Sequence, residues 1–296
     1  TRVIVVGADG GLLADGAPAE VFGRHGDALA AAGVWVPGHP VDLPVLPSLR
    51  STVLGALSED GARATTETKR APRPAAVLAT RGLAVTRDRR RAVQQGLDLQ
   101  IPDAAATVIV GPNGAGKSTL ALTLAGLLAP LQGEVVAADR LRGRRGVRPE
   151  RWASRELLTR IGMVFQDPEH QFLTQTVREE LAVGPRALGW DTARIDAVVD
   201  ALLERLGLAA LAEANPFTLS GGQKRRLSVA TVLAAAPAVI VLDEPTFGQD
   251  RRGWIGLVAL LQEEIARGTT VIAVTHDADV IRHLGGQRIE LSGVAA

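Results

Sequence analysis

Cysteine and tyrosine are both missing from this 296-residue sequence, and methionine occurs once. Without cysteine, the chain can form neither a disulfide framework nor a cysteine-ligated zinc site. No apolar run reaches the roughly 18 residues that a membrane-spanning helix needs, so the sequence predicts no such helix. The formal net charge is +1, which gives no reason to expect non-specific binding of nucleic acid. Hydrophobic residues make up 46% of the chain, enough for a sizeable core.

A glycine-rich segment at residues 111–119 fits a loop that binds phosphate groups. Its three glycines allow successive backbone N–H groups to point at a phosphate, and a helix expected at residues 117–128 adds the positive end of its dipole. Lys117 is placed to bridge the β- and γ-phosphates of a nucleotide, and the Ser118 hydroxyl to bind Mg²⁺. The expected nucleotide-binding residues of this loop are Gly111, Pro112, Asn113, Gly114, Ala115, Gly116, Lys117, Ser118 and Thr119.

A second anion-binding segment is predicted about a hundred residues later. Ser220 is a good N-cap for a helix expected at residues 224–235, and the glycines beside it let backbone N–H groups approach a phosphate closely. Because the chain already has one phosphate loop, a second cradle makes most sense if it binds the nucleotide of another subunit. The segment consists of Leu219, Ser220, Gly221, Gly222 and Gln223.

Acidic and imidazole side chains follow two of the expected strands. The apolar segment 239–242 leads into Asp243 and Glu244. Asp243 can hold Mg²⁺ through water, and Glu244 points to where an attacking water would sit. His276 follows another apolar strand, and an imidazole at the carboxyl end of a parallel strand can reach a γ-phosphate. Taken alone, a buried glutamate and a core histidine with only structural roles are the alternatives.

The order of these segments resembles that of ATP-binding-cassette (ABC) ATPase domains over residues 75–296. The resemblance implies an α/β fold of the P-loop NTPase type. It has a RecA-like core, an antiparallel β subdomain and a helical signature subdomain at about 167–236. It also implies that the substrate is ATP and the cofactor Mg²⁺. The partner is then a second ATPase half, in the same polypeptide or as a dimer, whose nucleotide the signature segment contacts.

The same resemblance implies roles for individual residues. Glu244 matches the general base and His276 the switch histidine, which makes both expected catalytic residues. Gln166 ends a strand expected at residues 161–165 and matches the Q-loop, which touches Mg²⁺ and a transmembrane partner. Asp250 matches the acid of the D-loop. The expected Mg²⁺ ligands are Ser118, Gln166 and Asp243.

Two positions depart from the ABC pattern. Arg87 stands where an aromatic residue usually stacks on adenine, so we expect its guanidinium plane to stack on the base in an ATP site. That substitution leaves the base selectivity open. Gln249 stands in the D-loop where leucine is commoner, while the acid at Asp250 is retained, so we expect the loop to function.

The segment that follows Gln166 points to one kind of ABC protein. Residues 167–173 read Asp-Pro-Glu-His-Gln-Phe-Leu and resemble the ATPase subunits of energy-coupling-factor (ECF) transporters, which import vitamins and Ni²⁺ or Co²⁺. The resemblance implies a peripheral ATPase at the cytoplasmic face of the cell membrane. Its partners would be a transmembrane ECF-type subunit and a substrate-binding membrane protein, and no nucleic acid.

Residues 1–37 are expected to be the C-terminal remnant of a preceding ATPase copy. They read as a strand, a turn, a second strand and a helix, which cannot bury a core alone. They resemble the segment that follows the switch histidine in ABC domains, and a natural N-terminal extension is the alternative. Residues 38–74 are expected to form a proline-rich linker, with one or two helical turns within residues 48–57.

Two other functions compete with transport. A soluble tandem ABC protein acting on ribosomes or nucleic acid would be expected to join its copies by a long charged helix, and the proline-rich linker does not fit that. A half that binds ATP without hydrolysing it would not be expected to keep both Glu244 and His276.

Two local expectations can be tested directly by a structure. Residues 97–101 alternate between apolar and polar side chains, which predicts a single strand. Residues 176–206 are predicted to be mainly helical, with interruptions at Gly184-Pro185 and at Gly189.

Overall fold

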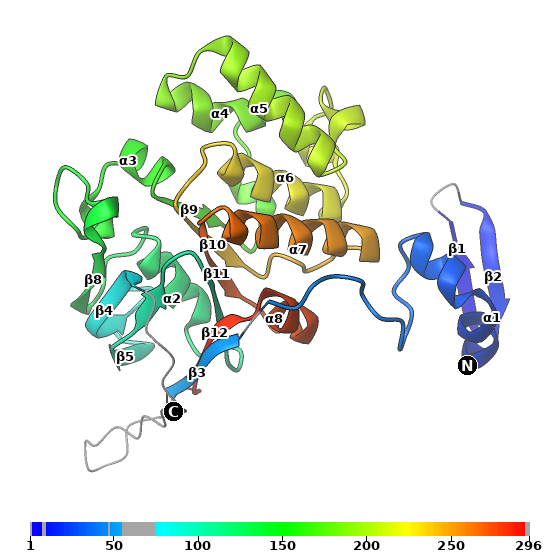
Figure 1. Ribbon diagram of the computed structural model, residues 1–296, viewed down its shortest axis with the longest axis horizontal. Helices are drawn as coiled ribbons and strands as arrows, with labels where there is room; N and C mark the ends of the chain where they lie inside the picture. The colour runs from blue at the N-terminus through cyan, green and yellow to red at the C-terminus, as the bar shows by residue number, and fades with distance from the viewer. Residues whose placement is uncertain (1, 8–9, 47, 55–74, 294–296) are drawn as a thin grey trace.

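A parallel sheet of six strands forms the centre of the protein in the computed structural model, which describes residues 2–7, 10–46, 48–54 and 75–293. Its strands are β3 (Ser48–Leu54), β7 (Ala106–Val110), β9 (Ile161–Val164), β10 (Val239–Asp243), β11 (Thr270–Val274) and β12 (Gly286–Leu291). They pair in the order β3-β12-β7-β11-β10-β9, and every pair is parallel (Figure 1). The carboxyl ends of the strands therefore share one edge of the sheet.

Both faces of this sheet are buried. Ile240 and Leu242 of β10 pack into one apolar cluster, while Val239 and Val241 pack into the other, because successive strand residues point to opposite faces. Parallel strands covered on both faces read as continuous apolar runs, which is why β10 and β11 show no polar alternation. The first cluster is built with α6 (Gly221–Leu233), α7 (Arg251–Ala266) and α8 (Ala278–Leu284), and the second with α2 (Lys117–Leu124).

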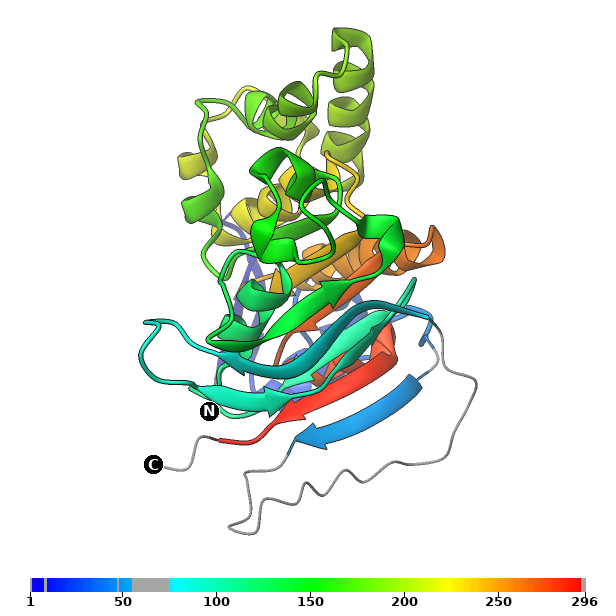
Figure 2. The ribbon, with the colours of Figure 1, turned by 90° about the vertical axis from the view of Figure 1, so that its left-hand side faces the viewer.

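A smaller, mostly helical layer lies beyond α6, at the top of Figure 2. Its longer helices are α4 (Val177–Leu188) and α5 (Thr192–Arg205), and both contribute to the first cluster. The remaining helices are short: α3 (Ser154–Leu158), η1 (Asp139–Leu141), η2 (Pro149–Arg151), η3 (Pro168–Gln171), η4 (Ala209–Leu211) and η5 (Pro216–Thr218).

The antiparallel sheet is built on β4 (Ala76–Val85), which pairs with β5 (Gln94–Leu97), β6 (Gln100–Pro102) and β8 (Gln132–Ala137). The prediction of one strand at residues 97–101 was wrong, because two strands, β5 and β6, stand there. The buried Thr80 side chain interrupts the ladder: its hydroxyl donates to Leu97 O at 2.7 Å and accepts from Leu99 N at 2.8 Å. Side-chain bonds of this kind replace backbone pairing locally.

One helical prediction also needs correction. The interruption expected at Gly184-Pro185 is absent, since α4 runs through Pro185 and ends before Gly189, whose φ is 78°. Pro185 lies in the last turn of α4, where its missing N–H removes only one intrahelical bond. Gly184 allows a close approach to Ala235 at the end of α6, so packing between the two helices offsets that loss.

The first residues form a small unit of their own, with β1 (Val3–Val6) and β2 (Leu12–Gly16) paired antiparallel and α1 (Pro18–Ala31) packed on one side. This confirms the expected strand, strand and helix. In the described part of the chain, β1 and β2 pair only with each other. Three of their exposed side chains are apolar, namely Ile4, Val6 and Leu12, and the exposed Asp15 pairs with Arg2.

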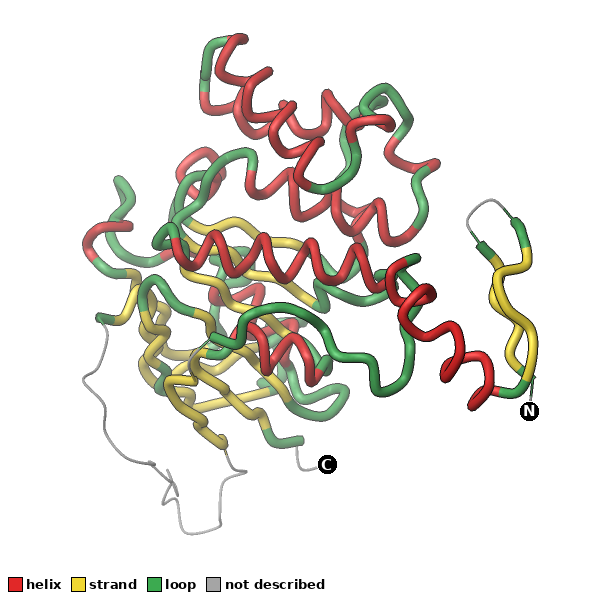
Figure 3. The backbone as a smooth tube through the Cα atoms, turned by 45° about the vertical axis from the view of Figure 1, so that its right-hand side comes forward, coloured by secondary structure: helices red, strands yellow, loops and turns green. Residues whose placement is uncertain are grey.

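Residues 33–46, which we call the strap, run from α1 back across the larger body of the protein (Figure 3). Its Val41 and Leu43 pack against the first apolar cluster. Pro44 O accepts from Gln262 Nε2 at 2.7 Å. After the strap, β3 joins the edge of the parallel sheet beside β12, so the helical turns expected in residues 48–57 were wrong for residues 48–54. Thr52 and Val53 are β-branched, which favours a strand there; residues 55–57 lie outside the described part.

No helix among the described residues combines the length and the apolar character needed to cross a membrane.

One glycine at the start of β12 should be unusually sensitive to substitution. Gly286 has a φ of 74°, and a Cβ added there would lie 2.2 Å from Ala106 O, at the junction with β7. Gly268 also has a positive φ, of 97°, but has no atom within 4 Å of such a Cβ. Gly268→Ala should therefore lose only about 1–2 kcal/mol of unfolding free energy through backbone strain. Gly286→Ala should lose about 1–3 kcal/mol more. Urea unfolding of both variants measures this, and equal losses would contradict the packing argument.

Candidate nucleotide-binding and catalytic site

The phosphate loop lies between the buried strand β7 and the first turn of α2. Gly114 and Gly116 have φ of 81° and 86°, the conformation that allows neighbouring N–H groups to point to one side. Lys117 is buried, and its ammonium donates to Gly111 O at 2.8 Å and to Pro112 O at 2.9 Å. A triphosphate can take the place of these carbonyls as the partner of the ammonium, because it carries negative charge.

Burial lowers the pKa of Lys117, while the negative charges of Glu244 and Asp243 raise it in part. The lysine is therefore near Asp243, the last residue of β10, and Glu244, which follows it. A buried cation without a full counter-charge favours an anion at this position.

Asp243 and Ser118 meet at the point expected for a metal ion. Burial raises the pKa of Asp243, and a hydrogen bond from the Ser118 hydroxyl and the charge of Arg225 lower it. A hydroxyl and a carboxylate side by side are suitable oxygen ligands for Mg²⁺. Among the described side chains no group of three or more His, Cys, Asp or Glu residues could hold a metal ion. Phosphate oxygens would then have to complete the coordination of Mg²⁺.

Glu244 adopts an unusual backbone conformation directly after β10. Its φ is 48°, which is rare for a residue with a side chain, and its N–H donates to Val274 O of β11 at 2.8 Å. The carboxylate accepts a hydrogen bond from Thr275 Oγ1 at 3.3 Å. Local strain of this kind costs about 1–3 kcal/mol and persists where the surrounding structure fixes it, commonly at functional sites.

His276 lies beside this carboxylate. Its Nε2 is 3.8 Å from Glu244 Oε1, and its side chain is half exposed, so the ring is open to a ligand. The next residue, Asp277, accepts from Trp254 Nε1 at 2.7 Å and from Thr246 Oγ1 at 3.1 Å, which fixes the backbone that carries His276. The sequence reading missed Asp277 and Trp254, although an acid next to the histidine was a visible signal.

A pocket of about 610 Å³ opens beside these residues. It is lined by Ser118, Asp243, Gln166 and Arg87, and the exposed Phe247 stands at its side. The structure thus brings the three expected metal ligands to one pocket, together with the arginine expected at the base. The charge of Arg87 lowers the pKa of Asp243, so the two side chains interact across this pocket.

The signature segment begins helix α6. Ser220 is its N-cap, with Gln223 N donating to Ser220 Oγ at 3.4 Å and Ser220 N donating to Gln223 Oε1 at 2.9 Å. Ser220 and Gly221 are exposed, whereas Leu219 is buried and anchors the segment. This confirms the predicted cap, and it leaves the first turn of α6 accessible to an anion from outside the chain.

Helix α6 is tied to the segment that follows β9 by contacts that the sequence did not reveal. The buried Arg225 donates to Phe165 O at 2.7 Å and to Gln166 O. Lys224 Nζ lies 2.5 Å from Glu169 Oε1, and Ser228 Oγ donates to Gln171 Oε1 at 2.6 Å. The only signal for these contacts was the basic run that follows the pentapeptide. These contacts couple Gln166 to the start of α6.

Asp250 caps α7 and holds the D-loop, residues 247–250. Its carboxylate accepts from Gly253 N at 2.7 Å, which is the usual role of an aspartate N-cap. The structure thus gives Asp250 a local role at the helix start.

The sequence profile of the ABC transporter family matches residues 94–247, which include the phosphate loop, the signature segment and both acids. YkoD of Bacillus subtilis (strain 168), whose name describes an HMP/thiamine import ATP-binding protein, is 36% identical over 282 residues. That alignment covers 95% of this chain and 49% of YkoD, so the chain spans about half the length of that relative.

Two further relatives give the same picture. The energy-coupling factor transporter ATP-binding protein EcfA of Methanocaldococcus jannaschii is 37% identical over 190 residues, 64% of this chain and 66% of EcfA. A solved structure of cbiO1 from Clostridium perfringens, described as part of the ABC transporter complex cbiONQ, matches with a TM-score of 0.58 and 31% identity. The match covers 70% of this chain and 80% of cbiO1. The phosphate loop, the two acids, His276 and the capped signature helix thus stand in a chain that belongs to the ABC transporter family.

Proposed function

We propose that this chain is the ATP-hydrolysing component of an importer of the ECF type, which drives uptake of a vitamin or metal ion through a membrane partner. The observation that carries the catalytic part is the Glu244 carboxylate, which is held beside His276 at the carboxyl end of β10. The transport part rests on the likeness to EcfA and to cbiO1.

Hydrolysis follows from the placement of these groups. The phosphate loop and Lys117 hold the triphosphate, and Ser118, Asp243 and Gln166 hold Mg²⁺, which neutralises phosphate charge when bound. Glu244 takes a proton from a water whose oxygen attacks the γ-phosphorus. The bond from that phosphorus to the bridging oxygen breaks, and the oxygen leaves with ADP. His276 contacts the γ-phosphate and keeps Glu244 and the phosphate aligned.

A second ATPase domain completes each site in this proposal. The first turn of α6 is exposed at Ser220 and Gly221 and has free N–H groups, so it can bind the γ-phosphate held by another domain. That domain is in the same polypeptide or in a second chain. The small N-terminal unit points to the same partner. Its Ile4, Val6 and Leu12 are exposed, so this apolar surface is available to another domain. The strand β12, which follows His276 in this chain as a similar strand would in another copy, is covered by its neighbour β7. We therefore propose that residues 1–37 are the end of another ATPase copy, joined through the strap to a domain formed by β3 and residues 75–296.

The proposed contact with the membrane partner lies at η3. Leu173 and Phe217 are exposed there, and Phe217 packs edge-on against Phe172 with ring centroids 5.8 Å apart. Because η3 is tied to α6 through Glu169 and Gln171, a helix of the partner docked on it would move together with the signature segment. Such a partner would place the ATPase peripherally, at the cytoplasmic face of the membrane.

Glu244→Gln should keep ATP binding and lower the turnover number by about 10²–10⁴, because it removes the general base and leaves the phosphate loop intact. Phosphate release and calorimetric ATP binding measure the two properties separately. Glu263→Gln, which changes an exposed carboxylate on α7, is the matched control and should hydrolyse normally. Ordinary turnover by Glu244→Gln would refute the assignment.

Ser220→Arg should abolish hydrolysis while ATP still binds the isolated chain, because the long cation stands on the surface offered to the other domain's nucleotide and leaves Lys117 and the phosphate loop unchanged. Thr192→Arg is the control, since it places an arginine at another exposed helix start, that of α5. A Ser220→Arg protein that hydrolyses ATP at the wild-type rate would rule out the shared site.

Arg87→Ala should weaken ATP and GTP binding to a similar, small extent, because a guanidinium contact with an exposed base is worth only about 0.5–1 kcal/mol. Arg87→Tyr should tighten ATP binding slightly. In the wild-type protein GTP should compete within about tenfold of ATP, since the triphosphate and Mg²⁺ supply most of the affinity. Competition binding measures this. A strong ATP preference that survives Arg87→Ala would show that another residue reads the base.

A further inference from the structure

The D-loop is bonded to the signature segment through Gln249, the residue that replaces the commoner leucine. The Gln249 side chain is buried, and its Nε2 donates to Gly222 O at 3.0 Å. Its Oε1 accepts from Arg226 Nη1 at 3.3 Å. A leucine could make neither bond. The amide therefore fixes the D-loop to the first turn of α6, whose N–H groups the proposed function aims at a phosphate.

The strap also forms hydrogen bonds with the D-loop and with the start of α7. The indole N–H of Trp35 donates to Gln249 O at 3.1 Å. Gly33 O accepts from Arg251 N at 2.9 Å, so the strap satisfies one of the free N–H groups at the start of α7. Arg251 Nη2 donates to Pro40 O at 2.7 Å. Residues more than two hundred positions earlier in the chain thus hold the junction between the D-loop and α7.

Trp35 is also connected to the catalytic glutamate. Its ring packs edge-on against Trp254, with centroids 5.7 Å apart and an interplanar angle of 85°. Trp254 donates to Asp277 Oδ2 at 2.7 Å, and Asp277 N donates to Thr275 Oγ1 at 3.0 Å. The hydroxyl of Thr275 in turn donates to Glu244 Oε2 at 3.3 Å. Each step of this path is a contact of ordinary length, and its last member is the proposed base.

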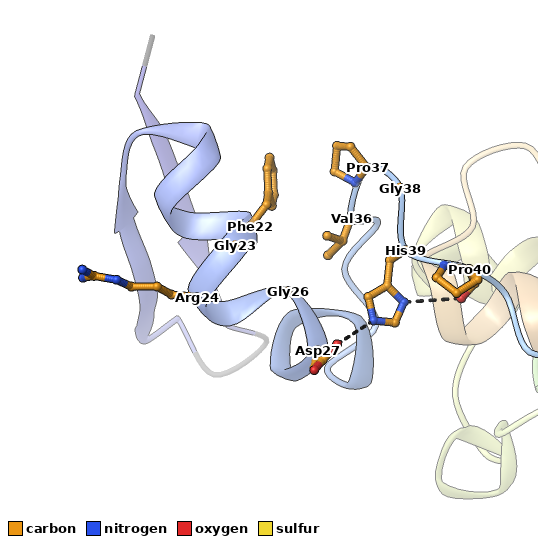
Figure 4. A pocket seen from close by; sticks show the side chains of 10 residues that line it. All are labelled: Phe22, Gly23, Arg24, Gly26, Asp27, Val36, Pro37, Gly38, His39 and Pro40. Atoms are coloured by element: carbon orange, nitrogen blue, oxygen red, sulfur yellow. Dashed lines mark hydrogen bonds and ion pairs between the residues drawn. The ribbon is translucent and has the colours of Figure 1, made fainter.

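The strap is also anchored to the N-terminal unit. His39 bridges Asp27 of α1, at 3.0 Å, and Pro40 O, at 3.3 Å, beside a shallow pocket of about 470 Å³ between α1 and the strap (Figure 4). At its far end, Pro44 O accepts from Gln262 and lies 3.1 Å from His283 Nδ1. The strap is therefore fixed at both ends, with Trp35 between α1 and the D-loop.

We infer that Trp35 and Gln249 are positioning residues for ATP hydrolysis. They act as a clamp that holds the D-loop so that the signature segment and the Glu244 backbone keep one relative placement. Neither residue lines the nucleotide pocket, so the clamp acts on turnover and leaves nucleotide binding alone. The inference rests on the proposed ATPase function. It adds that the N-terminal unit, through the strap, sets the geometry of the site.

Four variants of the full chain test the clamp. Trp35→Phe keeps an aromatic ring against Trp254 and removes the N–H that bonds to the D-loop. Gln249→Leu restores the commoner residue and removes both side-chain bonds. The double variant combines the two changes. Trp190→Phe is the matched control, because Trp190 packs under Arg194 in the helical layer, with 3.5 Å from the guanidinium to the ring centroid. For each, kcat and KM for ATP, calorimetric affinity for a non-hydrolysable ATP analogue and the melting temperature are measured.

Trp35→Phe should lower kcat about fivefold, the effect of one typical net hydrogen bond, and Gln249→Leu, which removes two bonds, should lower it at least as much. The affinity for the analogue should stay within about twofold of the wild-type value, well below the tenfold change that about 1.4 kcal/mol of binding free energy would give. The double variant should lose less than the product of the single losses, because both residues act on the same loop. Trp190→Phe should match the wild-type protein in every measurement.

Three outcomes would overturn the clamp: unchanged kcat in both single variants, losses that multiply in the double variant, or a fall in kcat matched by an equal fall in analogue affinity. If one variant does not fold, the other single variant still decides between the first and third outcomes. A wild-type chain that neither binds the ATP analogue nor hydrolyses ATP would instead refute the proposed function, so the two failures are distinguishable.

Discussion

The parallel pairing of β7, β10 and β11 is the constraint on which the rest of the structure depends. It brings the phosphate loop, the acids after β10 and His276 to one edge of a sheet that is buried on both faces. A register shift of one residue would turn every side chain of a buried strand into the opposite apolar cluster and disrupt the packing of both. The positions of Glu244 and His276 relative to Lys117 are therefore set by packing deep in the core, well away from any nucleotide.

What the sheet edge does not fix is the other half of the site. The signature segment sits on a helix, α6, whose orientation depends on contacts with the segment after β9 and with the D-loop. These contacts are polar and directional, in contrast to the apolar packing of the sheet. Contacts of this kind tie α6 to the segment after β9, so the two can shift as one unit relative to the sheet, which is what the proposed transmission of ATP binding to a membrane subunit needs.

The sequence predicted the core of the site well, because its chemistry is local. A glycine-rich loop, a helix cap at Ser220 and acids after an apolar strand are short patterns, and the structure shows them where expected. Contacts between distant segments left no such pattern. Nothing in the spacing of residues indicates that Trp35 bonds to Gln249, or that Arg225 reaches the carbonyls of Phe165 and Gln166. The strand at residues 48–54 was missed for the same reason, since its partner β12 lies more than two hundred residues away.

The central claim is that one nucleotide is held by two domains. A structure of the Glu244→Gln chain with bound ATP and Mg²⁺ tests it most directly. The account predicts a γ-phosphate that contacts Lys117 and His276 of one domain and Ser220 of another. A γ-phosphate contacted by Ser220 of the same chain, or a nucleotide bound away from Lys117, would contradict it.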